Sequence, residues 1–122
     1  MSSFTIRSAD SSDADTVLEL WRLAGMMPSR TDDETSICAL VGTLIAGFNG
    51  WRGMLFRLAI LPERRRAGIG RTLVAAGERS LRERGARRVG LQALKTEQVA
   101  RDFWLAVGYS TDDYSQRYVR NL

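Results

Sequence analysis

Residues 58–71 read LAILPERRRAGIGR, an apolar segment followed by a proline, an arginine run and two glycines. The pattern predicts a buried strand that ends at the proline, then a loop, then a helix. Gly68 and Gly70 carry no Cβ and let the backbone approach a ligand closely, and the unpaired N–H groups at a helix start attract anions. Arg66 and Arg71 flank these groups and can add charge-assisted hydrogen bonds. The stretch therefore predicts a site for a diphosphate.

The two glycines alone are not specific, because a tight turn between a strand and a helix has the same spacing. The surrounding residues exclude two other phosphate-binding motifs. A dinucleotide-binding motif needs a third glycine, where this chain has Leu73, and it follows the first strand of its fold instead of lying in mid-chain. A P-loop needs Gly-Lys followed by serine or threonine, and the sequence has no such triplet.

Hydrophobic periodicity predicts strands and helices on both sides of this stretch. Residues 54–61 are apolar apart from Arg57, which predicts a strand in the middle of a sheet, and Asn49-Gly50 predicts a hairpin to the strand before it. The expected strands are residues 4–7, 41–48, 54–61, 89–94 and 114–119, and the expected helices are residues 14–21, 31–40, 70–84 and 97–107. The order β-α-α-β-β-α-β-α-β indicates an α/β (α+β) fold.

A second segment, ARDFWLAVGY at residues 100–109, closes the last expected helix. Together with residues 58–71 and the amphipathic helix after them, it resembles the acetyl-CoA signature of the GNAT superfamily of N-acetyltransferases. Both motifs stand in that family's order and separation. The resemblance covers residues 54–109, with a looser match at residues 6–23. It implies a single N-acetyltransferase domain over residues 1–122, with a mixed central sheet flanked by helices.

The resemblance also implies which residues bind acetyl-CoA. Backbone amides of the loop and the first helical turn would surround the pyrophosphate, and these residues are Arg65, Arg66, Ala67, Gly68, Ile69, Gly70 and Arg71. The strand before the loop would pair with the pantetheine arm like an added strand, through Leu58, Ala59 and Ile60. An amide of that strand would donate to the thioester carbonyl. A primary amine on a small molecule or a peptide would then attack directly.

Four departures from the family pattern bear on catalysis and on the sheet. Trp104 stands where the family places a tyrosine that donates to the leaving sulfur, and Glu97 stands where an asparagine is frequent. Residues 54–61 have no carboxylate to act as a general base, so acid and base are both unassigned and Trp104 is the catalytic candidate.

Residues 31–40 must hold both the second helix and a further strand. Either that strand is missing, or their last five residues form it and the helix is reduced to a turn. A missing strand would leave residues 41–48 as an exposed edge, which predicts a homodimer or a covering segment.

Composition narrows the remaining function classes. The 122 residues contain no histidine and one cysteine, Cys38, which excludes Ser-His-Asp and Cys-His mechanisms, an internal disulfide and the common zinc sites. No apolar run reaches the length of a membrane span and no signal-peptide pattern occurs, so we expect a cytoplasmic protein without a membrane partner. Seventeen arginines, one lysine and a pI near 10.0 leave a basic nucleic-acid-binding module as an alternative, although the aromatic residues have core spacings. A second alternative, favoured by Trp104, is a protein that binds acetyl-CoA without turnover.

Overall fold

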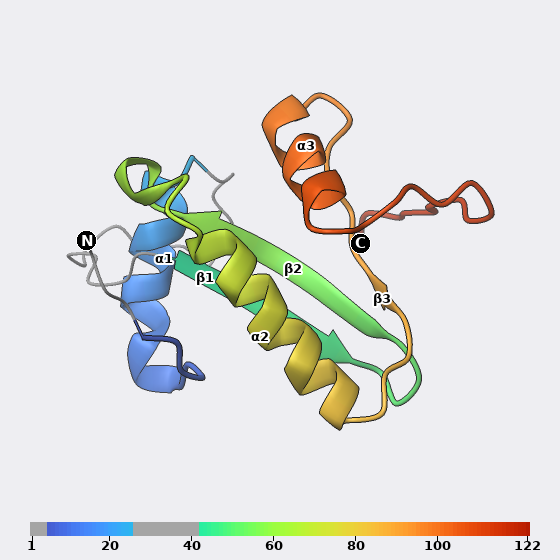
Figure 1. The fold of residues 1–122 in the computed structure, drawn as a ribbon, viewed down its shortest axis with the longest axis horizontal. Helices are drawn as coiled ribbons and strands as arrows, with labels where there is room; N and C mark the ends of the chain where they lie inside the picture. The colour runs from blue at the N-terminus through green and yellow to red at the C-terminus, as the bar shows by residue number, and fades with distance from the viewer. Residues whose placement is uncertain (1–4, 26–41) are drawn as a thin grey trace. The chain divides into compact units, whose positions relative to one another are not determined.

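The structure is a computed structural model that describes residues 5–25 and 42–122. Its elements in chain order are η1 (Ser11–Asp13), α1 (Ala14–Leu23), β1 (Gly42–Phe48), β2 (Gly53–Ile60), η2 (Pro62–Arg64), α2 (Ile69–Glu83), β3 (Val89–Gly90) and α3 (Gln98–Ala106), where η marks a short 3₁₀ helix (Figure 1). The backbone forms two compact units, residues 1–91 and 92–122, and the first unit contains the sheet with α1 and α2. The single domain expected over residues 1–122 stays a prediction.

The sheet is mixed, as expected, with the strand order β1-β2-β3. β1 pairs antiparallel to β2 from its first residue to its last. β2 pairs parallel to β3 only at Gly53↔Val89 and Met54↔Gly90. β2 therefore lies in the middle of the described sheet, which confirms the central position predicted from its apolar sequence.

β2 contains a β-bulge near its carboxyl end. The register of β1 against β2 shifts between Thr43 and Ile45, where two residues of β2, Arg57 and Leu58, stand opposite one residue of β1. Arg57 has a φ of 54°, in the left-handed region that glycine adopts more easily than other residues. A bulge of this kind bends its strand and changes the direction in which the following backbone groups point.

α2 covers one face of β1 and β2 (Figure 1). Its inward stripe is buried and consists of Ile69, Val74, Gly77 and Leu81. Gly77 permits close approach, because a Cβ there would lie 3.0 Å from Cδ2 of Leu44 and 3.4 Å from Cδ2 of Leu55. The apolar core of the described residues comprises Leu20, Leu55, Ala59, Leu61, Ile69, Val74, Leu81 and Ala86. The helix predicted from about Gly70 to Arg84 is confirmed to within one residue at each end.

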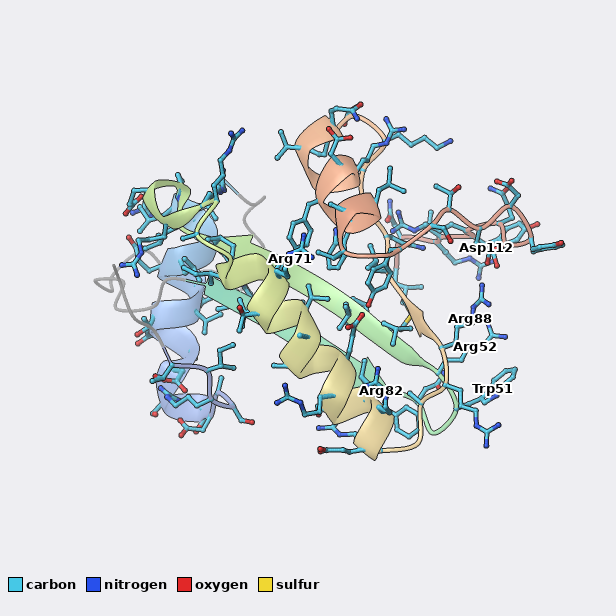
Figure 2. The ribbon with its side chains drawn as sticks, viewed as in Figure 1. Trp51, Arg52, Arg71, Arg82, Arg88 and Asp112 are labelled. Atoms are coloured by element: carbon cyan, nitrogen blue, oxygen red, sulfur yellow. The ribbon has the colours of Figure 1, made fainter. Side chains whose placement is uncertain are left out.

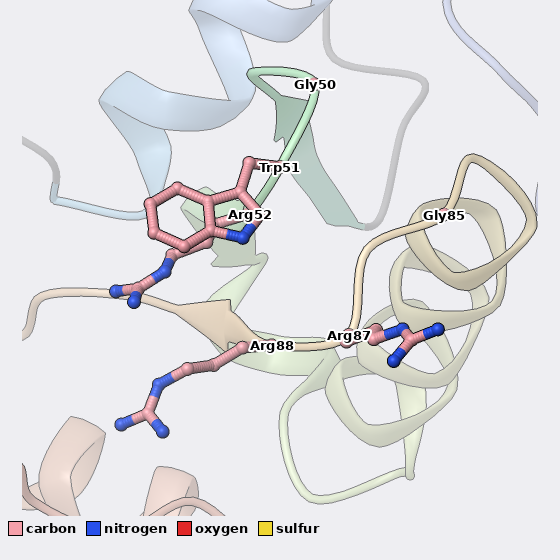
Figure 3. A pocket seen from close by; sticks show the side chains of 6 residues that line it. All are labelled: Gly50, Trp51, Arg52, Gly85, Arg87 and Arg88. Carbon is pink, nitrogen blue, oxygen red and sulfur yellow. The ribbon is translucent and has the colours of Figure 1, made fainter.

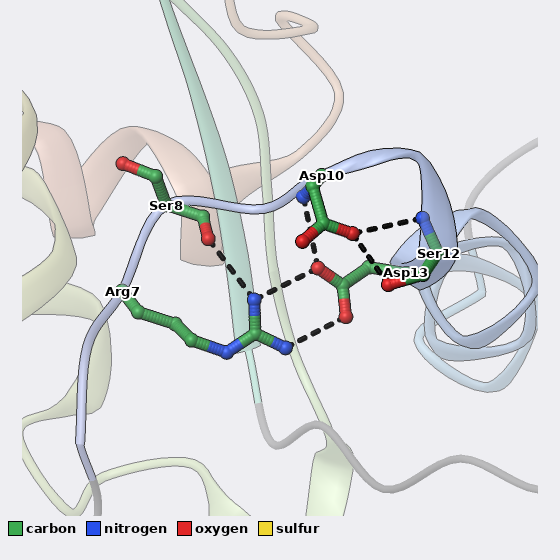
Figure 4. A network of polar contacts seen from close by, with 5 residues as sticks. All are labelled: Arg7, Ser8, Asp10, Ser12 and Asp13. Carbon is green, nitrogen blue, oxygen red and sulfur yellow. Dashed lines mark hydrogen bonds and ion pairs between the residues drawn. The ribbon is translucent and has the colours of Figure 1, made fainter.

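A polar network fixes the chain at the start of α1 (Figure 4). The guanidinium of Arg7 donates to the two carboxylate oxygens of Asp13, at 2.8 and 2.7 Å. The Asp10 carboxylate accepts from the backbone N–H of Ser12, while Asp13 accepts from the N–H of Asp10, which completes a capping box. The hydrogen bond from Arg7 is the main reason that the pKa of Asp13 falls from 3.8 to about 2. The carboxylate therefore stays ionised well into the acid range.

Two expected strands are wrong, and a third is shorter than expected. Residues 5–7 and 114–119 form no strand, because neither segment pairs with a neighbouring strand in the described part of the chain. The strand expected at residues 89–94 shortens to β3. The other helices and strands that fall on described residues are confirmed to within two residues at their ends.

Residues 31–40 lie outside the described residues. The expectations for the second helix, for the further strand and for Cys38 therefore stay predictions. None of the helices in residues 5–25 and 42–122 is long and apolar enough to cross a membrane.

Candidate functional site

The chain leaves β2 at Ile60 and reaches α2 through a loop with two left-handed residues. η2 contains Pro62–Arg64, after which Arg66 has a φ of 64° and Gly68 a φ of 81°. The left-handed conformation costs about 1–2 kcal/mol for a residue with a Cβ, so it is strained at Arg66 and relaxed at Gly68. α2 then begins at Ile69, which is 2% exposed and anchors the first helical turn in the core.

The first turn of α2 has backbone N–H groups available for an anion. The N-cap residue Gly68 has no side chain to cap them, and its carbonyl accepts from the N–H of Thr72 at 3.1 Å and from the Thr72 hydroxyl at 2.8 Å. The N–H groups of Ile69, Gly70 and Arg71 precede that first helical hydrogen bond, so the helix does not satisfy them. Together with the positive end of the helix dipole, they suit a phosphate group.

The three arginines predicted at this loop differ in their contacts. Arg65 turns back onto the protein, where Nε donates to the Ile60 carbonyl at 3.1 Å and Nη2 donates to the Ala24 carbonyl at 3.3 Å. Its side chain therefore ties the loop to the ends of β2 and α1. Arg66 and Arg71 are exposed, and neither side chain makes a hydrogen bond or ion pair within the residues that the structure describes (Figure 2 labels Arg71). Their guanidinium groups remain available to an anionic ligand.

The edge of β2 that faces away from β1 is open over its second half. The pairing with β3 ends at Met54↔Gly90. Beyond that point this edge, which includes Leu58, Ala59 and Ile60, has no strand partner among residues 5–25 and 42–122. An extended ligand can pair with such an edge as an added strand. The open stretch leads directly into the loop with the available amides.

Three side chains hold the bulge of β2, and we call Trp21, Thr43 and Arg57 the bulge clamp. The guanidinium carbon of Arg57 lies 4.5 Å from the ring centroid of Trp21, which is a cation–π contact. The indole N–H of Trp21 donates to the Thr43 hydroxyl at 2.9 Å, and that hydroxyl donates to the Arg57 carbonyl at 3.4 Å. The clamp therefore influences how the next amide, that of Leu58, is presented. The sequence does not reveal the clamp, because no periodic pattern links α1 to β2.

The second compact unit contains Trp104, the predicted catalytic residue. α3 ends in a Schellman cap, in which the N–H of Tyr109 donates to the Trp104 carbonyl at 2.9 Å and the N–H of Gly108 donates to the Leu105 carbonyl at 3.2 Å. The Trp104 ring meets the rings of Tyr109 and Phe103 edge-on, with centroids 5.3 and 5.1 Å apart. The spacing of glycine and aromatic residues in this segment therefore builds a capped helix end that holds the half-buried Trp104 ring.

Glu19 is a buried carboxylate of α1, with 6% of the residue exposed. It accepts two hydrogen bonds from Arg22, at 2.6 and 3.1 Å, and these lower its pKa. A carboxylate that is held ionised accepts a proton poorly near neutral pH, so Glu19 does not fill the unassigned place of a general base. The described residues contain no group of three or more histidine, cysteine, aspartate or glutamate side chains that could hold a metal ion.

Comparison with known proteins gives one family and several similar structures. The model of the acetyltransferase (GNAT) family matches residues 4–109. AAC(6′)-Iy in complex with the bisubstrate analogue CoA-S-monomethyl-acetylneamine is 16% identical, with a TM-score of 0.73 over 95% of this chain and 97% of that chain. The apo aminoglycoside antibiotic 6′-N-acetyltransferase AAC(6′)-IG from Acinetobacter haemolyticus is 15% identical, with a TM-score of 0.72 over 98% and 99% of the two chains.

A third similar structure is the ribosomal-protein-S18-alanine N-acetyltransferase from Escherichia coli. It is 20% identical, with a TM-score of 0.70 over 85% of this chain and 76% of that chain. No curated protein sequence matches the chain. At these identities the structural likeness shows the fold, which is an α/β fold with a mixed sheet and flanking helices, as the sequence predicts.

Proposed function

The chain belongs to the GNAT family of acetyltransferases, and from this premise we propose that it transfers an acetyl group from acetyl-CoA to a primary amine. The family consists of acetyl-CoA-dependent acyltransferases, so the co-substrate follows from membership. When bound, acetyl-CoA supplies an activated thioester carbonyl and a thiol leaving group. The amine is proposed to attack that carbonyl directly, so that an amide and CoA leave the enzyme.

The uncapped first turn of α2 is the observation that carries this proposal. A diphosphate needs several donors on one side, and the amides of Ile69, Gly70 and Arg71 provide them. A Cβ added at Gly68 would meet no atom within 4 Å, so packing inside the protein leaves the space beside this loop open. The side chains of Arg66 and Arg71 would add charge-assisted hydrogen bonds. Arg65 is proposed to act differently, by holding the loop in place through Ile60 and Ala24.

The open edge of β2 supports the proposed role of Leu58, Ala59 and Ile60 in holding the pantetheine arm. Backbone hydrogen bonds along a strand edge fix an extended ligand without requiring particular side chains. The bulge at Arg57 turns one amide out of the regular ladder, and we assign that amide, on Leu58, as the donor to the thioester carbonyl. The bulge clamp would keep this donor in place during the reaction.

No carboxylate occurs on β2 from Gly53 to Ile60, so no side chain of that strand can act as a general base. The amine must then arrive deprotonated, and the rate should rise with pH until the amine is neutral. A simple thiol has a pKa of about 8.5, so the leaving thiolate needs little protonation. The indole N–H of Trp104 can donate a hydrogen bond but cannot deliver a proton. We therefore propose that Trp104 contacts the leaving sulfur without acting as a general acid.

A protein that binds acetyl-CoA without turnover is the second candidate, because Trp104 replaces the family's tyrosine. A panel of amines separates the two candidates. The names of the similar structures suggest aminoglycosides and peptide N-termini as its first members, and polyamines and free amino acids complete it. Release of free CoA thiol measures turnover, and calorimetry measures acetyl-CoA affinity. Turnover with any amine establishes the enzyme, while acetyl-CoA binding without turnover across the panel favours the second candidate.

Gly68→Asp tests the phosphate site within the same experiment. The new carboxylate would repel a diphosphate at the start of α2, so acetyl-CoA binding should be lost. Gly25→Asp is a matched control, because Gly25 has a φ of 82° beside 81° for Gly68 and neither position has an atom within 4 Å of an added Cβ. A folded Gly68→Asp variant with the parent's acetyl-CoA affinity would refute the proposed site.

A further inference from the structure

An arginine-rich surface surrounds an exposed tryptophan at the C-terminal end of α2. A hollow of about 400 Å³ lies between the β1–β2 turn and the segment that joins α2 to β3 (Figure 3). Its lining residues are Gly50, Trp51, Arg52, Gly85, Arg87 and Arg88. We propose that this surface, the Trp51 surface, binds single-stranded nucleic acid independently of the acetyl-CoA site.

The β1–β2 turn holds Trp51 and Arg52 in a defined position. The side-chain oxygen of Asn49 accepts from the backbone N–H groups of Trp51 at 2.9 Å and Arg52 at 2.7 Å. The N–H of Gly53 donates to the Arg88 carbonyl at 3.0 Å, which ties the turn to the segment after α2. The surface is therefore built by a hydrogen-bonded turn and not by a free loop.

The end of α2 is equally well defined. The N–H of Ala86 donates to the Leu81 carbonyl at 3.0 Å and that of Gly85 donates to the Arg82 carbonyl at 3.0 Å, which is a Schellman cap with Gly85 at a φ of 103°. Ala86 is buried, whereas Arg87 is exposed. This cap stops the helix and directs the chain across to β3, so that Arg87 borders the hollow, with its side chain directed toward α2 in Figure 3.

Trp51 is a large aromatic residue that lies outside the apolar core. It is 71% exposed, and the guanidinium carbon of Arg52 lies 4.5 Å from its ring centroid. Figure 3 shows the two side chains beside each other. Single-strand-binding proteins stack unpaired bases on exposed aromatic rings and add cation–π contacts from arginines. The core spacing inferred from the sequence for the aromatic residues is therefore wrong for Trp51.

The charge of the Trp51 surface suits phosphates. Three exposed arginines line it, Arg52, Arg87 and Arg88. The adjoining end of α2 adds the exposed Arg82 and Arg84 and one exposed carboxylate, Glu83 (Figure 2 labels Arg52, Arg82 and Arg88). A helix C-terminus favours basic residues, which accounts for Arg82 and Arg84. It does not account for Arg52 or Arg87, which lie outside the helix.

The combination of an aromatic ring with arginines indicates which class of ligand the Trp51 surface binds. An acidic peptide would use the charges but not the flat ring, and a membrane surface would require more apolar side chains than Trp51 alone. A single-stranded nucleic acid carries a phosphate and an unpaired base in each nucleotide, so one ligand can contact both the arginines and the ring. α2 has 15 residues and is therefore about 22 Å long, so the two ligands would occupy opposite ends of the helix.

Fluorescence anisotropy with a labelled oligonucleotide of about 12 nucleotides tests the proposal on the whole chain. Trp51→Ala should weaken binding about tenfold, while Trp51→Phe retains most of the affinity because a ring remains. Replacing Arg52 and Arg87 together by alanine should reduce the slope of log affinity against log salt by about 1.4, since each lost contact to a single strand removes about 0.7. Circular dichroism and melting confirm that each variant is folded.

Replacing Arg66 and Arg71 together by alanine is the charge-matched control at the other end of α2, and it should weaken acetyl-CoA binding while leaving oligonucleotide binding unchanged. The reverse is expected for the variant at Arg52 and Arg87. Equal affinity for Trp51→Ala and the parent would overturn the proposal, as would equal binding of a duplex of the same length. Polyglutamate and phosphatidylserine vesicles are tested as competitors of the oligonucleotide. If either competes equally well against the parent and against Trp51→Ala, the surface binds an acidic protein or a membrane, and the proposal is overturned as well.

Discussion

Replacing Trp21 by phenylalanine tests whether the bulge clamp controls the proposed reaction. Arg57 has a left-handed φ of 54°, a conformation that costs about 1–2 kcal/mol for a residue with a Cβ. Its contacts with Trp21 and Thr43 offset that cost. Trp21→Phe removes the indole N–H, and with it the 2.9 Å hydrogen bond to the Thr43 hydroxyl, and it leaves a smaller ring against the Arg57 guanidinium.

The expected loss of stability follows from these two contacts. A partly buried hydrogen bond contributes about 1 kcal/mol and the difference between the two rings about 0.5 kcal/mol, so the variant should lose about 1.5 kcal/mol. For a domain of this size that lowers Tm by about 5 °C. The loss is comparable to the strain at Arg57, so β2 should relax toward a regular register. A donor to a developing oxyanion is worth about 10²–10³ in kcat, and partial misplacement of the Leu58 amide should lower kcat about 10- to 100-fold.

Steady-state turnover and acetyl-CoA calorimetry on the same preparation check this result. Acetyl-CoA affinity should stay within about tenfold of the parent, or 1.4 kcal/mol, because the first turn of α2 is unchanged and only the pantetheine contacts near Leu58 are affected. Arg57→Gly is the matched control, since glycine adopts a left-handed φ without strain and keeps the bulge although the cation–π contact is lost. It should retain kcat to within about threefold. A folded Trp21→Phe variant with the parent's kcat would refute the reasoning, and so would an equally inactive Arg57→Gly variant.

Three further predictions concern other parts of the chain. Trp104→Phe should lower kcat by no more than about tenfold, or 1.4 kcal/mol, with acetyl-CoA affinity intact; a loss of several hundredfold would make Trp104 directly catalytic. Gly53→Ala should destabilise the fold by about 1–3 kcal/mol in urea unfolding, because its Cβ would lie 2.7 Å from Cδ1 of the fully buried Leu81, and an unchanged midpoint would contradict the packing described. Asp13 has its pKa lowered from 3.8 to about 2 in the folded chain, so the stability it contributes is present above pH 4 and is lost as the pH falls toward 2. Asp13→Asn should remove that part of the acid dependence, and identical acid-unfolding curves would contradict this assignment.

Sequence patterns predicted the part of the fold in which signals are local. Each signal lies within a window of about fifteen residues, and the signals are the apolar run of β2, the proline after it, the glycines of the loop and the apolar stripe of α2. The predicted ends of β2 and α2 agree with the structure to within one residue. The strand expected at residues 114–119 failed for the opposite reason. Alternating side chains define two faces, but a strand also needs a partner, and none pairs with it in the described part of the chain.

The same distinction divides the candidate site. The available amides at Ile69, Gly70 and Arg71 follow from a helix start, which a sequence reveals. The different use of Arg65, which binds the carbonyls of Ile60 and Ala24, depends on where α1 ends relative to β2, and no spacing within the loop indicates it. The contact between Trp21 and Arg57 likewise joins elements far apart in the sequence. The role of Trp104 stays a prediction that rests on the closing motif.

The two ends of α2 suit anions by different physical means, which explains why their sequences differ. At the N-terminus the helix supplies unsatisfied amides and a partial positive charge, so glycines suffice and bulky side chains would obstruct the ligand. At the C-terminus the carbonyls carry a partial negative charge, which repels phosphate, so an anion site there has to come from side chains. That end has Gly85 as a cap and arginines from two segments of chain, with Trp51 offering a ring in place of amides. At about 22 Å apart, and with a screening length of about 8 Å at physiological salt, the two proposed sites would act on their ligands separately.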